Sequence, residues 1–133
     1  MASDLGGQDT DKKLIMIVDD DPTQLAMMKQ FLEPKYKVVL LPSGRDAINY
    51  LIDHKPDVIL LDYMMPLYNG VAVLNIIRSK ESTKDIPVFF LTGQSDTSTV
   101  MQCLALKPAG YIVKPVGRKD IIKKLEAWFY EHG

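Results

Sequence analysis

The sequence predicts an α/β fold, a doubly wound five-stranded parallel sheet with five helices. Five short apolar runs are spaced along the chain, and each is followed by a segment long enough to form a helix. Short continuous apolar runs are typical of strands that are buried on both faces of a parallel sheet. Neither an internal repeat nor a Ser/Gly-rich linker interrupts the alternation, so we expect one domain.

The five expected strands are the apolar runs themselves. They lie at about 13–18, 36–41, 57–61, 87–91 and 110–113. The first contains Leu-Ile-Met-Ile-Val and the third contains Val-Ile-Leu-Leu, so neither alternates between apolar and polar residues. We therefore expect helices on both faces of the sheet.

The five expected helices follow the strands in order. They span about 22–33, 43–53, 70–79, 96–106 and 118–130. Asp21 is the expected N-cap of the first helix, with Pro22 at its first position, and Ser43 caps the second, which runs to about Asp53. Apolar stripes at helical spacing support these helices, although the stripe in 96–106 is less regular.

Composition narrows the class of protein. The 133-residue chain is 47% apolar and 25% charged, close to a globular average. Its 16 Lys and Arg against 17 Asp and Glu give a net charge of −1, so nothing favours binding to nucleic acid or to an acidic membrane. The single cysteine, Cys103, cannot form an internal disulfide, and there is no apolar stretch of membrane-spanning length. We expect a cytoplasmic protein, with a flexible tail at 1–12 and a folded domain at 13–131.

Polar residues stand at the downstream ends of four of the apolar runs. They are the pair Asp19 and Asp20, then Asp62, Thr92 and Lys114. In an open parallel sheet the carboxyl ends of the strands converge on one crevice, where such folds bind ligands. Three carboxylates, a hydroxyl and an ammonium in one crevice predict a divalent cation beside an acidic group that can receive a phosphoryl group.

The adjacent carboxylates of Asp19 and Asp20 are the candidate metal ligands. Like charges in close proximity repel unless a cation neutralises them, and Mg²⁺ binds carboxylate, water and phosphate oxygens. The alternative is that Asp20 or Asp21 only caps the first helix, but three consecutive aspartates exceed what a cap requires. Asp62 is the candidate nucleophile, since an aspartate that attacks phosphorus forms a mixed anhydride. Taken alone, an aspartate such as Asp62 would be better interpreted as the start of an Asx turn, but its place at a strand end near the other polar residues favours the nucleophile.

Thr92 and Lys114 are the candidate donors to a phosphoryl oxygen, the lysine acting as a point charge. The alternatives are that Thr92 caps a turn and that Lys114 is an ordinary surface lysine. Either alternative could hold by itself. That both hold, at two strand ends of the same sheet edge, is less consistent with the sequence than a shared site.

Four segments, in this order along the chain, make a pattern that is more specific than any one of them. They are Leu-Ile-Met-Ile-Val-Asp-Asp-Asp-Pro at 14–22, Asp-Tyr-Met-Met-Pro at 62–66 with Gly70, Leu-Thr-Gly at 91–93, and Gly-Tyr-Ile-Val-Lys-Pro at 110–115. With them the chain, from about Lys13 to Tyr130, resembles the receiver domain of two-component response regulators. That domain is the flavodoxin-like (βα)5 module that a histidine kinase phosphorylates on aspartate.

The resemblance implies a phosphorylation site and its cation. Asp62 would be the phosphoacceptor, and Asp19 and Asp20 would be the acidic pair that serves Mg²⁺ or Mn²⁺. Met64 would lend its backbone carbonyl to the metal.

The resemblance also implies a switch. Thr92 would be the hydroxyl that moves toward the phosphoryl group, Tyr111 the aromatic residue that turns inward with it, and Lys114 the lysine that contacts the phosphoryl group. Met64 and Gln94 occupy positions that tune the phosphoryl lifetime in this family. Because Met64 is apolar, we expect it to shield the anhydride from water.

The expected partners follow from the same resemblance. They are a sensor histidine kinase or histidine phosphotransfer protein, and a downstream protein that binds the face of the fourth helix, fifth strand and fifth helix. A phosphorylation-dependent dimer is a further expectation, and neither direct nucleic-acid contact nor membrane insertion is expected. We expect a phosphoacceptor in a phosphorelay and not an enzyme.

Several alternatives stay open. The chain could be a receiver excised from a hybrid kinase or multidomain regulator, or a phosphate sink or shuttle. A small aspartyl-phosphate phosphatase is disfavoured because the Asp-x-Asp pattern of such enzymes lacks its second acid at Met64. A docking module that is never phosphorylated is disfavoured by the complete set of site residues.

Overall fold

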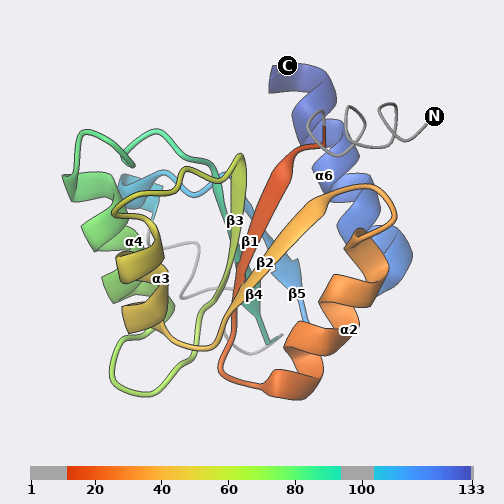
Figure 1. Ribbon diagram of the computed structural model, residues 1–133, viewed down its shortest axis with the longest axis horizontal. Coiled ribbons are helices and arrows are strands. Elements are labelled where there is room, and N and C mark those ends of the chain that lie inside the picture. The colour runs from red at the N-terminus through yellow and green to blue at the C-terminus, as the bar shows by residue number, and fades with distance from the viewer. Residues whose placement is uncertain (1–11, 94–103, 133) are drawn as a thin grey trace.

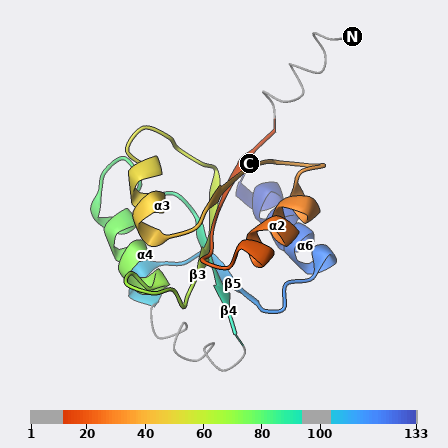
Figure 2. The same ribbon diagram turned by 60° about the horizontal axis from the view of Figure 1, so that its bottom comes forward.

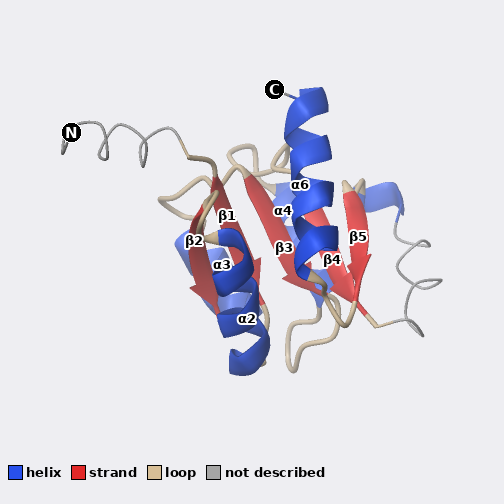
Figure 3. Ribbon diagram, turned by 90° about the vertical axis from the view of Figure 1, so that its right-hand side faces the viewer, coloured by secondary structure: helices blue, strands red, loops and turns tan. Residues whose placement is uncertain are grey.

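The five strands form one parallel sheet, as predicted. The computed structural model describes residues 12–93 and 104–132. The strands are β1 (Leu14–Val18), β2 (Lys37–Leu41), β3 (Val58–Asp62), β4 (Val88–Thr92) and β5 (Gly110–Val113). Their order is β2-β1-β3-β4-β5, and their arrows point the same way (Figure 3). All five carboxyl ends therefore lie at one edge of the sheet.

Helices cover both faces of the sheet (Figure 1). On one face lie α2 (Pro22–Leu32) and α6 (Arg118–His132), and on the other lie α3 (Gly44–Tyr50) and α4 (Gly70–Ser79). Most of the helix predicted at 96–106 falls outside the described residues, and only a 3-10 turn, η2 (Leu104–Leu106), is seen there. The described chain therefore shows four α-helices instead of five, and none of them has the length and apolar content of a membrane span.

The sheet divides the core into two clusters because successive strand side chains point to opposite faces. Ile15 and Ile17 belong to the cluster on the side of α2 and α6. Met16 and Val18 belong to the cluster on the side of α3 and α4. The unbroken apolar sequence of β1 therefore reflects a strand that is covered on both faces.

The predicted helix caps are present. The Asp21 carboxylate accepts a hydrogen bond from the Thr23 N–H at 2.9 Å, and the Ser43 hydroxyl accepts one from the Asp46 N–H at 3.0 Å. Both caps satisfy backbone donors that a helix leaves free at its first turn. The first turns of α2 and α3 are therefore fixed close to the acidic edge of the sheet.

The end of α3 differs from the prediction. The helix stops at Tyr50 and not at about Asp53, and residues 51–53 continue as turns. The Ile52 N–H donates to the Asn49 carbonyl at 3.2 Å, which is the three-residue spacing of a tightened last turn. The apolar stripe of the sequence runs on into this turn, so the pattern alone overestimated the helix.

Candidate functional site

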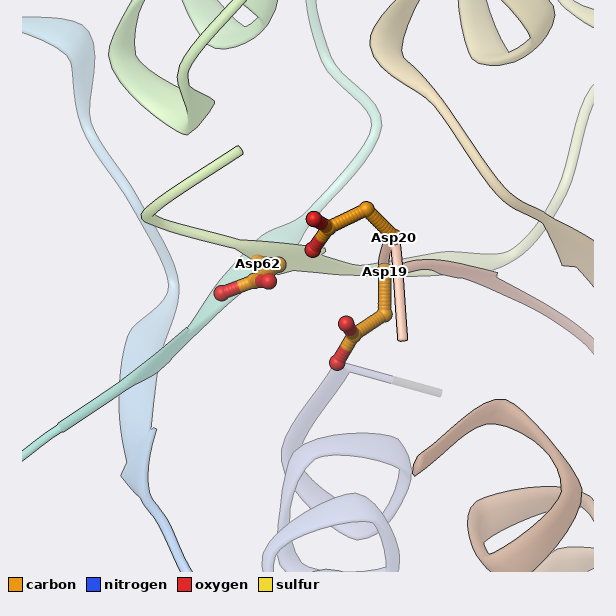
Figure 4. A group of neighbouring side chains, drawn as sticks. All are labelled: Asp19, Asp20 and Asp62. Carbon is orange, nitrogen blue, oxygen red and sulfur yellow. The ribbon is translucent and has the colours of Figure 1, made fainter. Parts of the chain in front are cut away.

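Three carboxylates meet where β1 and β3 end (Figure 4). Asp19 directly follows β1, and Asp62 is the last residue of β3. These strands are neighbours, with Val18 paired to Leu61, so the two aspartates lie side by side. One oxygen each of Asp19, Asp20 and Asp62 lies within 4.8 Å of the others. This is the point at which the chain moves from one side of β1 to the other, where α/β sheets bind ligands.

Lys114 reaches this cluster from the far side of β4. Its Nζ atom lies 3.2 Å from Oδ2 of Asp19 and 3.2 Å from Oδ1 of Asp62. The Lys114 N–H donates to the carbonyl of Thr92 at 2.7 Å, which ties its backbone to the end of β4, and the Lys114–Pro115 peptide bond is cis. The lysine therefore bridges two buried carboxylates while part of its own side chain stays accessible.

Burial raises the pKa of the Asp62 carboxyl to about 7. The neighbouring Asp19 raises this pKa as well, and the Lys114 ammonium opposes both effects. For Lys114, burial lowers the pKa, but the nearby Asp62 and Asp19 outweigh it and the net change is upward. Since one ammonium faces three carboxylates, the site retains an excess of negative charge that a cation would neutralise.

The Asp19 carboxylate fits the role of a metal ligand. Its Oδ1 atom accepts a hydrogen bond from the Asp21 N–H at 3.0 Å, which fixes the orientation of the group. Its Oδ2 atom is buried and accepts no well-aligned hydrogen bond from the described residues, although the Lys114 ammonium is close. A buried carboxylate oxygen without such a donor, beside two further carboxylates, suits a hard divalent cation.

The structure places Met64 beside Asp62. The Met64 N–H lies 3.3 Å from Oδ1 of Asp62, while the Met64 side chain is exposed. The role predicted for the Met64 carbonyl, as a metal ligand, stays a prediction. The other residue expected to tune a phosphoryl lifetime, Gln94, lies outside the described residues.

The two predicted switch residues lie on neighbouring strands. Thr92 is the last residue of β4 and is buried, and its hydroxyl donates to the Gly93 carbonyl at 3.2 Å. Tyr111 lies in β5 opposite Phe90 and is half-buried against the core on the side of α3 and α4. The threonine hydroxyl therefore lies at the carboxyl edge of the sheet, the edge that carries the acidic cluster. Tyr111 lies further from that edge.

The loop between β3 and α4 contains two features that the sequence did not reveal. A Cβ atom on Gly70 would lie 2.6 Å from the Asp62 carbonyl oxygen, so only glycine allows this close return of the chain. Leu67 has a φ of 68°, and the Tyr68 N–H donates to the Pro66 carbonyl at 2.8 Å around it. These are the features of a γ-turn of the rare, strained type. The sequence pattern included Gly70 but gave no structural reason for a glycine at that position. Nothing in the sequence predicted the turn at Leu67.

A family model described as the response regulator receiver domain matches residues 15–126. Among curated proteins, a probable cyclic di-GMP phosphodiesterase of Vibrio cholerae is 37% identical over 82% of this chain and 25% of its own length. The phosphate regulon transcriptional regulatory protein PhoB of Pseudomonas aeruginosa is 32% identical over 86% of this chain and 51% of its own length. The chain thus spans a quarter to a half of these two relatives.

Solved structures share the fold. The chemotaxis protein CheY4 of Vibrio cholerae has a TM-score of 0.81 and 25% identity, covering 87% of this chain and 98% of its own. The receiver domain of a sensor histidine kinase from Pseudomonas aeruginosa has a TM-score of 0.79 and 25% identity, covering 88% of this chain and 97% of its own. In that structure a magnesium ion is coordinated in the active-site cleft.

Proposed function

This chain belongs to the response regulator receiver domain family, and we propose that Asp62 is its phosphoacceptor. One observation carries the proposal. The Lys114 ammonium lies 3.2 Å from both Asp19 and Asp62, and Asp20 completes an acidic cluster beside them. This combination supplies a nucleophile, a cation site and a fixed positive charge within one crevice.

Asp19, Asp20 and Asp62 would hold Mg²⁺ or Mn²⁺, with the Met64 carbonyl as a further ligand. Carboxylate and carbonyl oxygens are ligands that such hard cations prefer. When bound, the cation would neutralise charge on the phosphoryl oxygens and so reduce their repulsion from the carboxylates. Two of the three carboxylates are buried, and Asp20 is exposed, so the site is open on one side to solvent and to a donor.

The position and orientation of the Asp62 carboxylate suit attack on phosphorus. It ends a strand that is buried along its whole length, and its carboxylate receives contacts from Lys114 and from the Met64 N–H. As the bond between an Asp62 oxygen and phosphorus forms, the bond between phosphorus and the donor imidazole breaks. Lys114 would then pair with the new phosphoryl oxygens, which keeps a positive charge at the place where negative charge accumulates.

The phosphoryl group would be read out through Thr92 and Tyr111. The Thr92 hydroxyl donates to the neighbouring Gly93 carbonyl, a local contact that can be exchanged for a phosphoryl oxygen. Movement of the threonine would leave space for the Tyr111 ring, and so change the surface formed by β5 and α6. We propose that a downstream protein binds this surface and that a histidine kinase or phosphotransfer protein supplies the phosphoryl group.

The proposed role covers the folded domain at about 13–131. Because the chain spans only part of its curated relatives, the receiver of a multidomain regulator or hybrid kinase is the second candidate. The activities in the relatives' names are those of the whole proteins. For this chain we propose a phosphoacceptor whose signal leaves through protein contacts, and not an enzyme that turns over a substrate.

The first experiment is intact-mass spectrometry after incubation with Mg²⁺ and phosphoramidate. The wild type should gain the mass of one phosphoryl group, and the gain should disappear in Asp62→Asn and with EDTA. Beryllofluoride, which mimics an acyl phosphate, should shift the amide resonances of Thr92 and Tyr111 in the same wild-type protein. A chain that neither gains mass nor responds to beryllofluoride would contradict the proposal.

A further inference from the structure

We propose that the groove between α3 and α4 binds an amphipathic helix from a partner protein, with acidic residues at both ends and two apolar side chains between them. This surface is separate from the acidic cluster and from the β5–α6 surface. The proposal does not depend on phosphorylation of Asp62.

Two hollows lie along this groove. α3 and α4 run side by side on one face of the sheet, as Figures 1 and 2 both show. The larger hollow, of about 210 Å³, has Ile52 and Thr83 in its wall, and the smaller, of about 120 Å³, has Tyr68. Ile48 and Ile76 line both hollows and form the ridge between them.

Two hollows that share the lining residues Ile48 and Ile76 suit a helix. Side chains at positions i and i+4 of a helix lie on one face with their Cβ atoms about 6 Å apart. One such pair could place an apolar side chain on each side of the ridge formed by Ile48 and Ile76. This is the mode by which a helix lies in a groove and is held by regularly spaced apolar anchors.

The lining is apolar and accessible. Ile52 is 74% exposed, although it adjoins the fully packed core around Leu51, and Ile48 and Ile76 are only half-buried. Tyr68, at the other end, is also exposed. Contiguous exposed apolar residues with a polar rim mark interaction sites in soluble proteins.

The charges around the groove specify the chemistry of the partner. Arg45, in the first turn of α3, lines the smaller hollow, and Lys80, just after α4, lines the larger one. Both helices run from the carboxyl edge of the sheet to its amino edge, so these cations lie at opposite ends of the groove. Among the described residues, no acidic side chain lines either hollow and neither cation forms an ion pair.

Unpaired cations at both ends favour an acidic partner. Lys29 pairs with Glu33 and Lys84 with Glu81, whereas Arg45 and Lys80 have no such acidic partner among the described residues. Two cations about one groove length apart fit a helix of about two turns that carries Glu or Asp at each end. They are too few for an acidic membrane surface, which attracts clusters of basic residues.

The test uses a synthetic helix as probe. It is a capped, alanine-based peptide with leucines at i and i+4 and two glutamates at each end, titrated into the ¹⁵N-labelled protein at low ionic strength. The amides of Ile48, Ile52 and Ile76 should shift. The same peptide with lysines in place of the glutamates should bind about tenfold more weakly, because like charges would then oppose one another.

Matched variants separate the groove from general charge effects. Ile52→Ser should weaken binding of the acidic peptide about tenfold, since an exposed isoleucine can be replaced without loss of the fold. Arg45→Glu combined with Lys80→Glu should reverse the preference between the two peptides. Arg118→Glu combined with Lys119→Glu makes the same charge change at the start of α6 and should leave the preference unchanged.

Several results would overturn the proposal. They are equal binding of both peptides, shifts that fall outside the groove, and no shift up to the solubility limit. Self-association in the ultracentrifuge that Ile52→Ser abolishes would assign the groove to a second copy of this chain instead. Sedimentation with phosphatidylserine vesicles that Arg45→Glu with Lys80→Glu abolishes would assign it to a membrane surface.

Discussion

The Nζ atom of Lys114 lies 3.2 Å from Oδ1 of Asp62, although β4 separates the strands that carry the two residues. Neighbouring strands are about 4.8 Å apart, so the lysine side chain must pass over the end of β4 to span roughly 10 Å. Only a long side chain with a terminal charge can do this. The contact therefore explains why a lysine, and not a shorter polar residue, follows β5.

We expect Lys114→Met to slow phosphorylation of Asp62 by roughly a hundredfold, because a methionine keeps the length but removes the charge that stabilises the phosphoryl oxygens. The measurement is the rate of mass gain with phosphoramidate and Mg²⁺. The matched control is Lys35→Met, which removes a lysine that pairs with Glu126 away from the site. Equal rates for the two variants would contradict the role given to Lys114.

We expect the pH dependence of stability to identify Asp62 in the metal-free protein. Its pKa is about 7 in the folded chain against an ordinary 3.8, so the folded state holds a proton between these values and the unfolded state does not. The protonated carboxyl therefore contributes stability that is fully present below pH 3.8 and is lost as the pH rises through about 7.

Asp62→Asn removes the ionisable carboxyl, and with it the loss of stability that ionisation of Asp62 causes as the pH rises. The variant should be more stable than the wild type at neutral pH, by on the order of 2 kcal/mol, and the difference should shrink as the pH falls. Urea unfolding with EDTA at a series of pH values measures it. Saturating Mg²⁺ should stabilise the wild type at neutral pH and not the variant. Parallel stability profiles for the two proteins would mean that Asp62 keeps an ordinary pKa.

We expect Gly70→Ala to destabilise the fold by about 2 kcal/mol, because backbone atoms at the end of β3 occupy the space that a Cβ atom needs. The added atom would lie 2.6 Å from the Asp62 carbonyl oxygen and 2.9 Å from Cα of Tyr63. Gly117→Ala is the matched control, since the nearest described atom to its Cβ would be an Asp120 carboxylate oxygen at 3.5 Å. Urea unfolding of both variants tests the difference, and similar stabilities would show that the loop can give way.

We expect Arg78→Lys to destabilise the protein by about 2 kcal/mol, because the lysine cannot reproduce the planar fork that reaches three carbonyls. Arg78 donates to Ile86 at 2.8 Å, Leu106 at 2.9 Å and Lys107 at 3.1 Å. It thus ties the end of α4 to the segments that lead into β4 and β5. Thermal unfolding measures the loss, and faster amide exchange at the start of β5 should accompany it.

The control for Arg78 is Arg118→Lys, at an exposed position whose side chain has no hydrogen bond or ion pair with the residues that the structure describes. It should leave the melting temperature almost unchanged. If Arg78→Lys melts at the same temperature as this control, the three hydrogen bonds contribute nothing beyond what water supplies.

The sequence by itself determined the fold class, the caps and the edge of the sheet at which the candidate site residues gather. These features depend on local rules: an apolar run predicts a buried strand, and Asp21 and Ser43 cap the helices that follow them. The four polar positions at the strand ends could be found in the same way, because parallel strands bring their carboxyl ends to one edge.

The distances between these side chains and the pKa of Asp62 could be obtained only from the tertiary structure. The reach of Lys114 to Asp62, the raised pKa of Asp62 and the three carbonyls held by Arg78 each join segments that are distant in sequence. The early end of α3 and the turn at Leu67 depend on hydrogen bonds that compete with the apolar pattern. Such contacts arise from packing in three dimensions, and no local pattern of residues encodes how close two side chains will come.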